Sequence, residues 1–197
     1  MSTLLVLRTS LSGDNSFSNR LLDELIAKTL TKWPDTRVVE RDLNAEQIPM
    51  LNSHTVGAIR AGVNDTEERR AAIALSDELI AELKAADYIA IGLPRYNFSA
   101  PASFKSYIDY IGRAGVTFRY TENGPEGLLP DVPVYAFITS GGAYAGTEHD
   151  QKSGWVKHVL GFLGLNKVEL IHAEGLAYAA DAAMAQANAR IDEIVAC

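Results

Sequence analysis

The sequence predicts an α/β fold in which helices cover both faces of a five-stranded parallel sheet. Short apolar runs alternate with longer amphipathic segments along the whole chain, and no internal repeat or low-complexity linker interrupts them. The chain has 197 residues, of which 47% are apolar and 22% charged, an ordinary globular balance. This length suits one well-buried domain spanning residues 1–197.

Five short apolar runs predict the strands. The first, third and fourth runs are almost continuously apolar, which is typical of strands that are covered on both faces. The expected strands are Leu4–Arg8, Arg37–Arg41, Tyr88–Leu93, Val134–Thr139 and Val168–His172.

Five amphipathic segments between these runs predict the helices, because their apolar residues recur at helical spacing. The expected helices are Asn19–Trp33, Glu67–Ala86, Ala102–Arg113, Trp155–Leu163 and Ala180–Val195. In the first helix the predicted apolar stripe comprises Leu22, Leu25, Ile26, Leu30 and Trp33.

The alternation of strands and helices also restricts the topology. Such strands pair in parallel, and the crossovers that join them are right-handed. Five strands and a small-ligand site favour the doubly wound order 2-1-3-4-5, while another three-layer α/β arrangement remains the alternative. A ligand binds such a sheet beyond the carboxyl ends of the strands, so the segments after strands 1, 3 and 4 are of most interest.

Charge and cysteine content exclude several classes of function. The net charge is -7 without any basic run, which argues against a nucleic-acid partner. The single cysteine, Cys197, cannot form a disulfide within the chain, and a thiol at the chain end is poorly held for catalysis. No signal peptide is apparent at the N-terminus, and no stretch approaches the about 18 apolar residues of a membrane span. We therefore expect a soluble cytoplasmic protein that does not contact a membrane.

Small hydrogen-bonding residues crowd the junction between the first strand and the first helix. Ser16 and Ser18 lie where the helix begins, and the unpaired amides and helix dipole there attract anions. The loop contains neither Gly-x-Gly-x-x-Gly nor Gly-Lys-Ser/Thr, which disfavours a dinucleotide and a nucleoside triphosphate. Two interpretations stay open: a site for one terminal phosphate, or a helix cap and a polar turn. The loop residues are Thr9, Ser10, Ser12, Asn15, Ser16 and Ser18.

The segment LPRYNFSAPASFK follows the third strand. Pro94 ends the strand, and Pro101 stands near the first turn of the next helix, where its missing N–H costs nothing. Two aromatic residues and an amide at the carboxyl end of a strand suit a planar heteroaromatic ligand. The alternative is a rigid connection whose aromatic side chains join the core.

The segment ITSGGAYAG follows the fourth strand. Gly141 and Gly142 would let the backbone approach a ligand closely, although a flexible turn explains them equally well in isolation. The functional interpretation rests on three such loops meeting at one edge of the sheet.

Together these segments resemble the FMN-dependent NADH:azo/quinone oxidoreductases, the bacterial azoreductase family. The matching motifs run through nearly the whole chain: SxSN at Ser16–Asn19, PxYNF at Pro94–Phe98, RAGVTFRYTENGPEGL at Arg113–Leu128, TSxG near Ser140 and AEGxAY at Ala173–Tyr178. The resemblance implies a flavodoxin-like fold and a homodimer that binds FMN noncovalently, one per subunit, at the dimer interface.

The resemblance also implies roles for individual residues. The FMN phosphate would be held by Ser10, Ser16, Phe17 and Ser18. The isoalloxazine ring would be lined by Arg95, Tyr96, Asn97 and Phe98, and its pyrimidine edge by Ser140, Gly141 and Gly142. The substrate site, which draws on both subunits in this family, would involve Tyr120, Phe162 and Arg60.

Two residues depart from the family pattern. Arg95 stands where methionine is frequent, and Gly141 stands where many members have arginine. If the Arg95 guanidinium points toward the substrate, it should favour anionic acceptors or NADPH. If it points to solvent, only the Arg95 backbone matters.

In this family the flavin carries the redox chemistry, so no side chain is expected to act as a nucleophile. NADH or NADPH would pass a hydride to flavin N5, and a quinone or azo compound would then take it in a ping-pong cycle. The scattered histidines and Glu148–Asp150 lack metal-ligand spacing, so no metal site is expected. The alternatives are a flavodoxin-like FMN electron carrier or binding protein without NAD(P)H oxidoreductase activity, and a relative that has lost FMN.

Overall fold

The computed structural model describes residues 2–196 and confirms the predicted five-stranded, doubly wound parallel sheet. Its order, β2-β1-β3-β6-β7, is the predicted order 2-1-3-4-5, because a separate hairpin takes the labels β4 and β5. The sheet comprises β1 (Thr3–Arg8), β2 (Arg37–Asp42), β3 (Tyr88–Pro94), β6 (Val134–Thr139) and β7 (Val168–Ala173). Cys197 lies outside the described residues.

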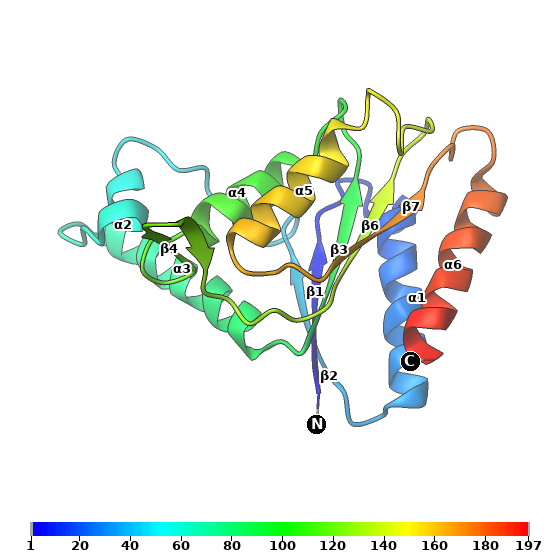
Figure 1. Ribbon diagram of the computed structural model, residues 1–197, viewed down its shortest axis with the longest axis horizontal. Helices are drawn as coiled ribbons and strands as arrows, with labels where there is room; N and C mark the ends of the chain where they lie inside the picture. Colours follow the sequence, from blue (N-terminus) through cyan, green and yellow to red (C-terminus); the bar gives the residue numbers. More distant parts are fainter. Residues whose placement is uncertain (1, 197) are drawn as a thin grey trace.

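Helices cover both faces of this sheet (Figure 1). On one face α1 (Phe17–Lys32) and α6 (Ala180–Ala196) lie side by side. The other face carries α3 (Glu67–Ala85), α4 (Ala102–Ile111) and α5 (Gln151–Phe162). No helix among residues 2–196 combines the length and the apolar character needed to cross a membrane.

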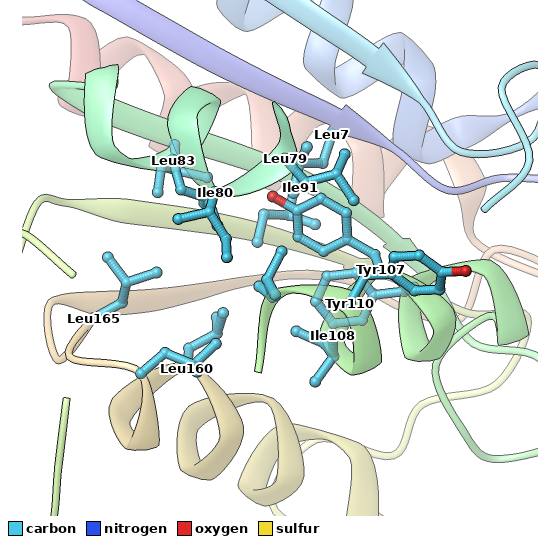
Figure 2. Packing of buried hydrophobic residues seen from close by; sticks show 14 of the residues in the cluster. Leu7, Leu79, Ile80, Leu83, Ile91, Tyr107, Ile108, Tyr110, Leu160 and Leu165 are labelled. Carbon is cyan, nitrogen blue, oxygen red and sulfur yellow. The ribbon is translucent and has the colours of Figure 1, made fainter. Parts of the chain in front are cut away.

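Two apolar clusters, one on each face, result from the alternation of side chains along the strands. In β1, Leu4 and Val6 pack with α1 and α6, whereas Leu5 and Leu7 pack with the three helices opposite. Figure 2 shows the second cluster, in which Leu7 of β1 lies near Leu79 of α3 and Tyr107 of α4, while Leu160 of α5 lies at the opposite end of the cluster. All of these strand residues are buried, as the continuous apolar runs predict.

Side-chain caps determine where three helices begin. The Ser16, Thr66 and Asp150 side chains accept hydrogen bonds from the backbone amides three residues later, at the starts of α1, α3 and α5. Because of the Asp150 cap, α5 begins at Gln151 rather than at the predicted Trp155.

The predicted apolar stripe of the first helix is wrong at its end. Leu30 and Trp33 are exposed, whereas Leu21, which the prediction omitted, is fully buried. The helix ends at Lys32, and Trp33 already has a non-helical backbone, so the helical period no longer places its side chain on the core face.

Four elements were not predicted: the 3-10 helix η1 (Gly13–Asn15), α2 (Val56–Ala61) and the antiparallel hairpin of β4 (Phe118–Thr121) and β5 (Gly124–Gly127). They are short and lack a periodic apolar pattern. The hairpin lies against the end of α5, where the Leu129 N–H donates to the Leu163 carbonyl at 3.0 Å. A methyl group on Gly127 would overlap the backbone nitrogen of Gly164, so the two backbones approach closely at this point.

We expect Gly127→Ala to destabilise the protein by about 3 kcal/mol, because the backbone of Gly164 cannot move aside as a side chain could. Gly154→Ala is the matched control, since a methyl group at that position in α5 meets no atom within 4 Å. Urea denaturation of both variants measures the difference. Equal stability of the two variants would contradict the close approach.

Candidate functional site

A cavity of about 310 Å³ opens at the carboxyl end of the sheet, where the sequence places the ligand. The loops after β1, β3 and β6 all contribute to it, as predicted, and so does the loop after β7. The predicted residues that line it are Ser10, Ser16, Phe17, Arg95, Tyr96, Ser140 and Gly141. Ser12 and Asn15 of the serine-rich loop line it too, as do Pro94 and Thr139 at the ends of β3 and β6. Leu176 and Ala177 also line it and were not predicted.

Four predicted cofactor residues do not line this cavity. Ser18 is buried behind Ser16, with 3.1 Å between the two hydroxyl oxygens. Phe98 is largely exposed and meets the Tyr144 ring edge-on at 5.6 Å. The Gly142 carbonyl is occupied by hydrogen bonds from the Gly175 N–H and the Ser140 hydroxyl. Asn97 lies in the exposed turn beside Tyr96.

The end of the cavity at α1 suits a phosphate. The Ser16 side chain caps α1 by accepting a hydrogen bond from the Asn19 N–H at 3.1 Å, and both Ser10 and Ser16 line the cavity. The first amides of a helix have no intrahelical acceptor, and the helix dipole is positive there. Hydroxyls and amides at a helix start are a donor set that fits an anion without a lysine.

Tyr96 joins the loops after β1 and β3. Its hydroxyl accepts a hydrogen bond from the Leu11 N–H at 3.0 Å and lies 3.2 Å from the Ser10 hydroxyl. The turn that follows is closed by reciprocal hydrogen bonds between Tyr96 and Ser99. Asn97 and Phe98 at its centre have φ values of 49° and 66°, in the left-handed region that non-glycine residues rarely adopt. Strained turns of this kind cluster at ligand sites.

Arg95 follows neither interpretation that the sequence left open. Its side chain is only 3% exposed, so it does not point to solvent. The guanidinium instead forms ion pairs with Asp150 at 3.0 Å and Glu174 at 3.4 Å, and it lies over the Tyr144 ring. Because two carboxylates neutralise the charge, Arg95 does not present a free cation to an anionic substrate. Its backbone borders the cavity, where its N–H donates to the Thr139 carbonyl at 2.7 Å.

The two carboxylates that pair with Arg95 are held ionised. Burial raises the pKa of Glu174, but hydrogen bonds from the Ala145 and Tyr144 amides outweigh burial and leave the pKa below its ordinary value. Burial likewise opposes ionisation of Asp150, and hydrogen bonds from Arg95 and Ser153 lower its pKa on balance. Asp150 thus caps α5 and pairs with Arg95, and no cluster of potential metal ligands occurs among residues 2–196.

Lys152, in the first turn of α5, is a buried cation that the sequence analysis did not single out. It is 2% exposed, and its Nζ donates to the Leu93 carbonyl at 2.5 Å. Burial, and then the positive charge of Arg95, lower the pKa of Lys152 to about 7, although Glu174 and Asp150 act in the opposite direction. The Lys152 amine therefore changes its charge near neutral pH.

The predicted substrate residues form a second cavity, of about 500 Å³, that is lined by separate residues. Arg60 from α2, Tyr120 from β4 and Phe162 from α5 all line it. The Phe118 ring lies 4.4 Å from the Phe162 ring and meets the Tyr120 ring edge-on at 5.5 Å. Tyr120 is 75% exposed. The structure thus brings the three residues together, but within one chain it does not join them to the first cavity.

We expect Arg95→Met to lower the free energy of unfolding by about 3–5 kcal/mol, because Asp150 and Glu174 would remain buried without their cation. Arg190→Met is the control, since its ion pairs with Glu169 and Glu193 lie at the surface and should contribute little. Urea denaturation measures both. An Arg95→Met variant as stable as Arg190→Met would show that the buried ion pairs do not stabilise the fold.

The pKa of Lys152 is about 7 in the folded protein, against an ordinary value of 10.5. Between pH 7 and pH 10.5 the unfolded chain therefore binds more protons than the folded protein does. The free energy of unfolding therefore rises with pH across this window, and this stabilisation is lost as the pH falls through 7. From pH 7 to about pH 9, we expect wild type to gain about 2 kcal/mol relative to Lys152→Met. If the free energies of unfolding of wild type and Lys152→Met changed in parallel with pH, this expectation would be contradicted. Lys157→Met, at an exposed position on the same helix, serves as the control.

Comparison with known proteins supports the same assignment of family. A family model described as a flavodoxin-like fold matches residues 2–195. An "FMN-dependent NADH:quinone oxidoreductase" of Bordetella avium is 45% identical over 97% of both chains, and one of Cellvibrio japonicus is 42% identical over 100% of both. The crystal structure of an azoreductase from Bacillus anthracis is similar, with a TM-score of 0.86 and 27% identity over 99% of both chains. The chain therefore belongs to the flavodoxin-like family, and within it to the group of FMN-dependent NADH:quinone oxidoreductases.

Proposed function

We propose that this protein is an FMN-dependent oxidoreductase that uses NADH to reduce quinones and azo compounds. One observation carries the proposal. A single cavity at the carboxyl end of the sheet is lined by the hydroxyl-bearing residues Ser10 and Ser16, by the start of α1, and by the loops after β3 and β6. Relatives that share 45% and 42% of the sequence are named for FMN, NADH and quinone. Because the reaction consumes NADH, we place the protein in the cytoplasm.

The residues of the cavity fit the two chemically different ends of FMN. Ser10, Ser16 and the first amides of α1 would hold the phosphate, with Ser18 supporting Ser16 from behind. Arg95 and Tyr96 would face the ring mainly through backbone groups, together with the Ser140–Gly141 backbone. Asn97, Phe98 and Gly142 would border the ring from beside this cavity. When bound, FMN supplies the redox chemistry, and the protein binds and orients it.

The separate reduction and oxidation of the bound cofactor would test this function. We expect the purified protein to be yellow, to lose its visible flavin absorbance when NADH is added without oxygen, and to regain it with a quinone. Initial rates with NADH and quinone varied together should give the parallel reciprocal plots of a ping-pong cycle. A protein that binds FMN but does not oxidise NADH would instead be an electron carrier, which is the competing function.

We further propose that the enzyme is a homodimer whose substrate sites are shared between subunits. Three large apolar residues, Leu11, Phe98 and Tyr178, are exposed near the mouth of the FMN cavity, each within two residues of one that lines it. Tyr120, on the hairpin beside the second cavity, is also exposed. Contact between these two surfaces would bury apolar area that a monomer leaves in water. It would also bring Arg60, Tyr120 and Phe162 of one subunit to the cofactor of the other.

Mixing two impaired variants tests this arrangement. Ser16→Glu should prevent phosphate binding by placing a second negative charge there, and Tyr120→Ala should damage only the shared substrate wall. In a mixed dimer, the intact FMN cavity of the Tyr120→Ala subunit meets the intact hairpin of the other subunit. We therefore expect the mixture to exceed the mean activity of its components. Activity equal to that mean, from a protein that sediments as a monomer, would contradict the shared site.

A further inference from the structure

We propose that Glu174 is a positioning residue for the ring end of the FMN site. Its carboxylate ties the loop after β3 and the loop after β6 to the end of β7, and so shapes the backbone that would face the flavin ring. The inference rests on the proposed function, and it concerns a residue outside the lining of the cavity.

Glu174 is the acceptor for four donors from two loops. One carboxylate oxygen accepts hydrogen bonds from the Tyr144 and Ala145 amides, both at 2.7 Å. The other accepts from the Arg95 guanidinium at 3.4 Å and lies 3.2 Å from the Ser140 hydroxyl, whose single proton it shares with the Gly142 carbonyl. The Glu174 side chain is buried, and hydrogen bonds to a charged acceptor are about twice as strong as neutral ones. The carboxylate therefore holds residues 140–145 in one conformation.

The backbone next to Glu174 supports the same loop. The amides of Gly175, Leu176 and Ala177 donate to the carbonyls of residues 142, 140 and 141, at 3.1 Å in each case. Leu176 and Ala177, on one side of this pairing, and Ser140 and Gly141, on the other, all line the cavity. Any shift of the Glu174 carboxylate would therefore be transmitted to the cavity wall.

Arg95 connects this arrangement to β3. The guanidinium lies 4.8 Å from the centre of the Tyr144 ring, while Glu174 holds the Tyr144 amide. Asp150, at the start of α5, pairs with the same guanidinium at 3.0 Å. Arg95 thus braces the loop after β6 by its side chain and borders the cavity by its backbone. The ion pairs act on the site through the loops, because they lie behind the cavity wall.

Two variants separate the reach of the carboxylate from its charge. Glu174→Asp keeps the charge, and therefore the partner of Arg95, but is one methylene too short to serve both amides. Glu174→Gln keeps the length and removes the charge. FMN and riboflavin, which lacks the phosphate, are titrated into the full-length apoprotein. Because only the ring end is altered, we expect both variants to lose affinity for the two flavins by the same factor, about tenfold.

Two controls calibrate this experiment. Ser16→Ala should weaken FMN and leave riboflavin unchanged, because it alters the phosphate end. Glu169→Gln, which removes a carboxylate from β7 that pairs with the exposed Arg190, should change neither affinity. The flavin midpoint potential gives a further readout that general destabilisation would not move: we expect Glu174→Gln to raise it and Glu174→Asp to leave it near wild type.

The outcomes separate this inference from the proposed function. If wild-type protein binds neither flavin, the proposed function fails. If wild type binds FMN while Glu174→Asp binds both flavins as tightly as wild type, Glu174 does not position the ring site. Loss of FMN affinity with unchanged riboflavin affinity would likewise overturn the inference, because the defect would then lie at the phosphate end.

Discussion

The parallel pairing of β1, β3 and β6 is the constraint on which the rest of the structure depends. These strands are apolar on both faces, so they are stable only when helices cover the sheet from both sides. Parallel strands direct all of their carboxyl ends to one edge. The chain leaves β1 toward β2 on one side and leaves β3 toward β6 on the other, so a crevice remains between the loops that follow β1 and β3. The cavity near Ser10 and Ser140 occupies this crevice.

The polar groups near the crevice are arranged in two layers. Neutral hydroxyls and backbone groups form the inner surface of the cavity, as at Ser16 and Gly141. The charged side chains of Arg95, Asp150 and Glu174 lie behind that surface, where the guanidinium forms ion pairs with both carboxylates. A buried charge is costly unless it is paired, so these three groups stabilise one arrangement of the loops rather than attract a ligand. Lys152 adds a cation whose charge depends on pH near neutrality.

The two cavities are separate because the short elements α2 and the hairpin β4–β5 help to form the second one only. The hairpin β4–β5 lies on the side of the molecule formed by α2, α4 and α5 (Figure 1). Its Tyr120 lines the second cavity, whereas the first cavity is lined by the loops at the carboxyl ends of the strands. The close contact of Gly127 with Gly164 holds the hairpin against α5 and so keeps the aromatic wall in place. One subunit thus keeps the two cavities apart, which is why we infer that two subunits combine them.

Part of the site was predictable because its signals are local. The serine-rich loop, the Tyr96 loop and the Ser140 loop each follow a recognisable strand, and all three line the cavity. The same rule applied to the fifth strand would have found Leu176 and Ala177, since they follow β7 directly. The short α2 and the hairpin escaped prediction because they have no apolar period of their own. The hairpin is held beside a distant segment, at the hydrogen bond between the Leu129 N–H and the Leu163 carbonyl.

The sequence by itself determined the order of strands and helices, the doubly wound topology and the edge of the sheet where the cavity lies, because hydrophobic periodicity and right-handed crossovers are local or general constraints. Only the tertiary structure decided the direction of the Arg95 side chain, since its partners Asp150 and Glu174 lie 55 and 79 residues further along the chain. It also decided the burial of Lys152, which depends on the Leu93 carbonyl 59 residues away. Pairings of this length leave no local pattern, because they arise only when the completed sheet brings the loops together.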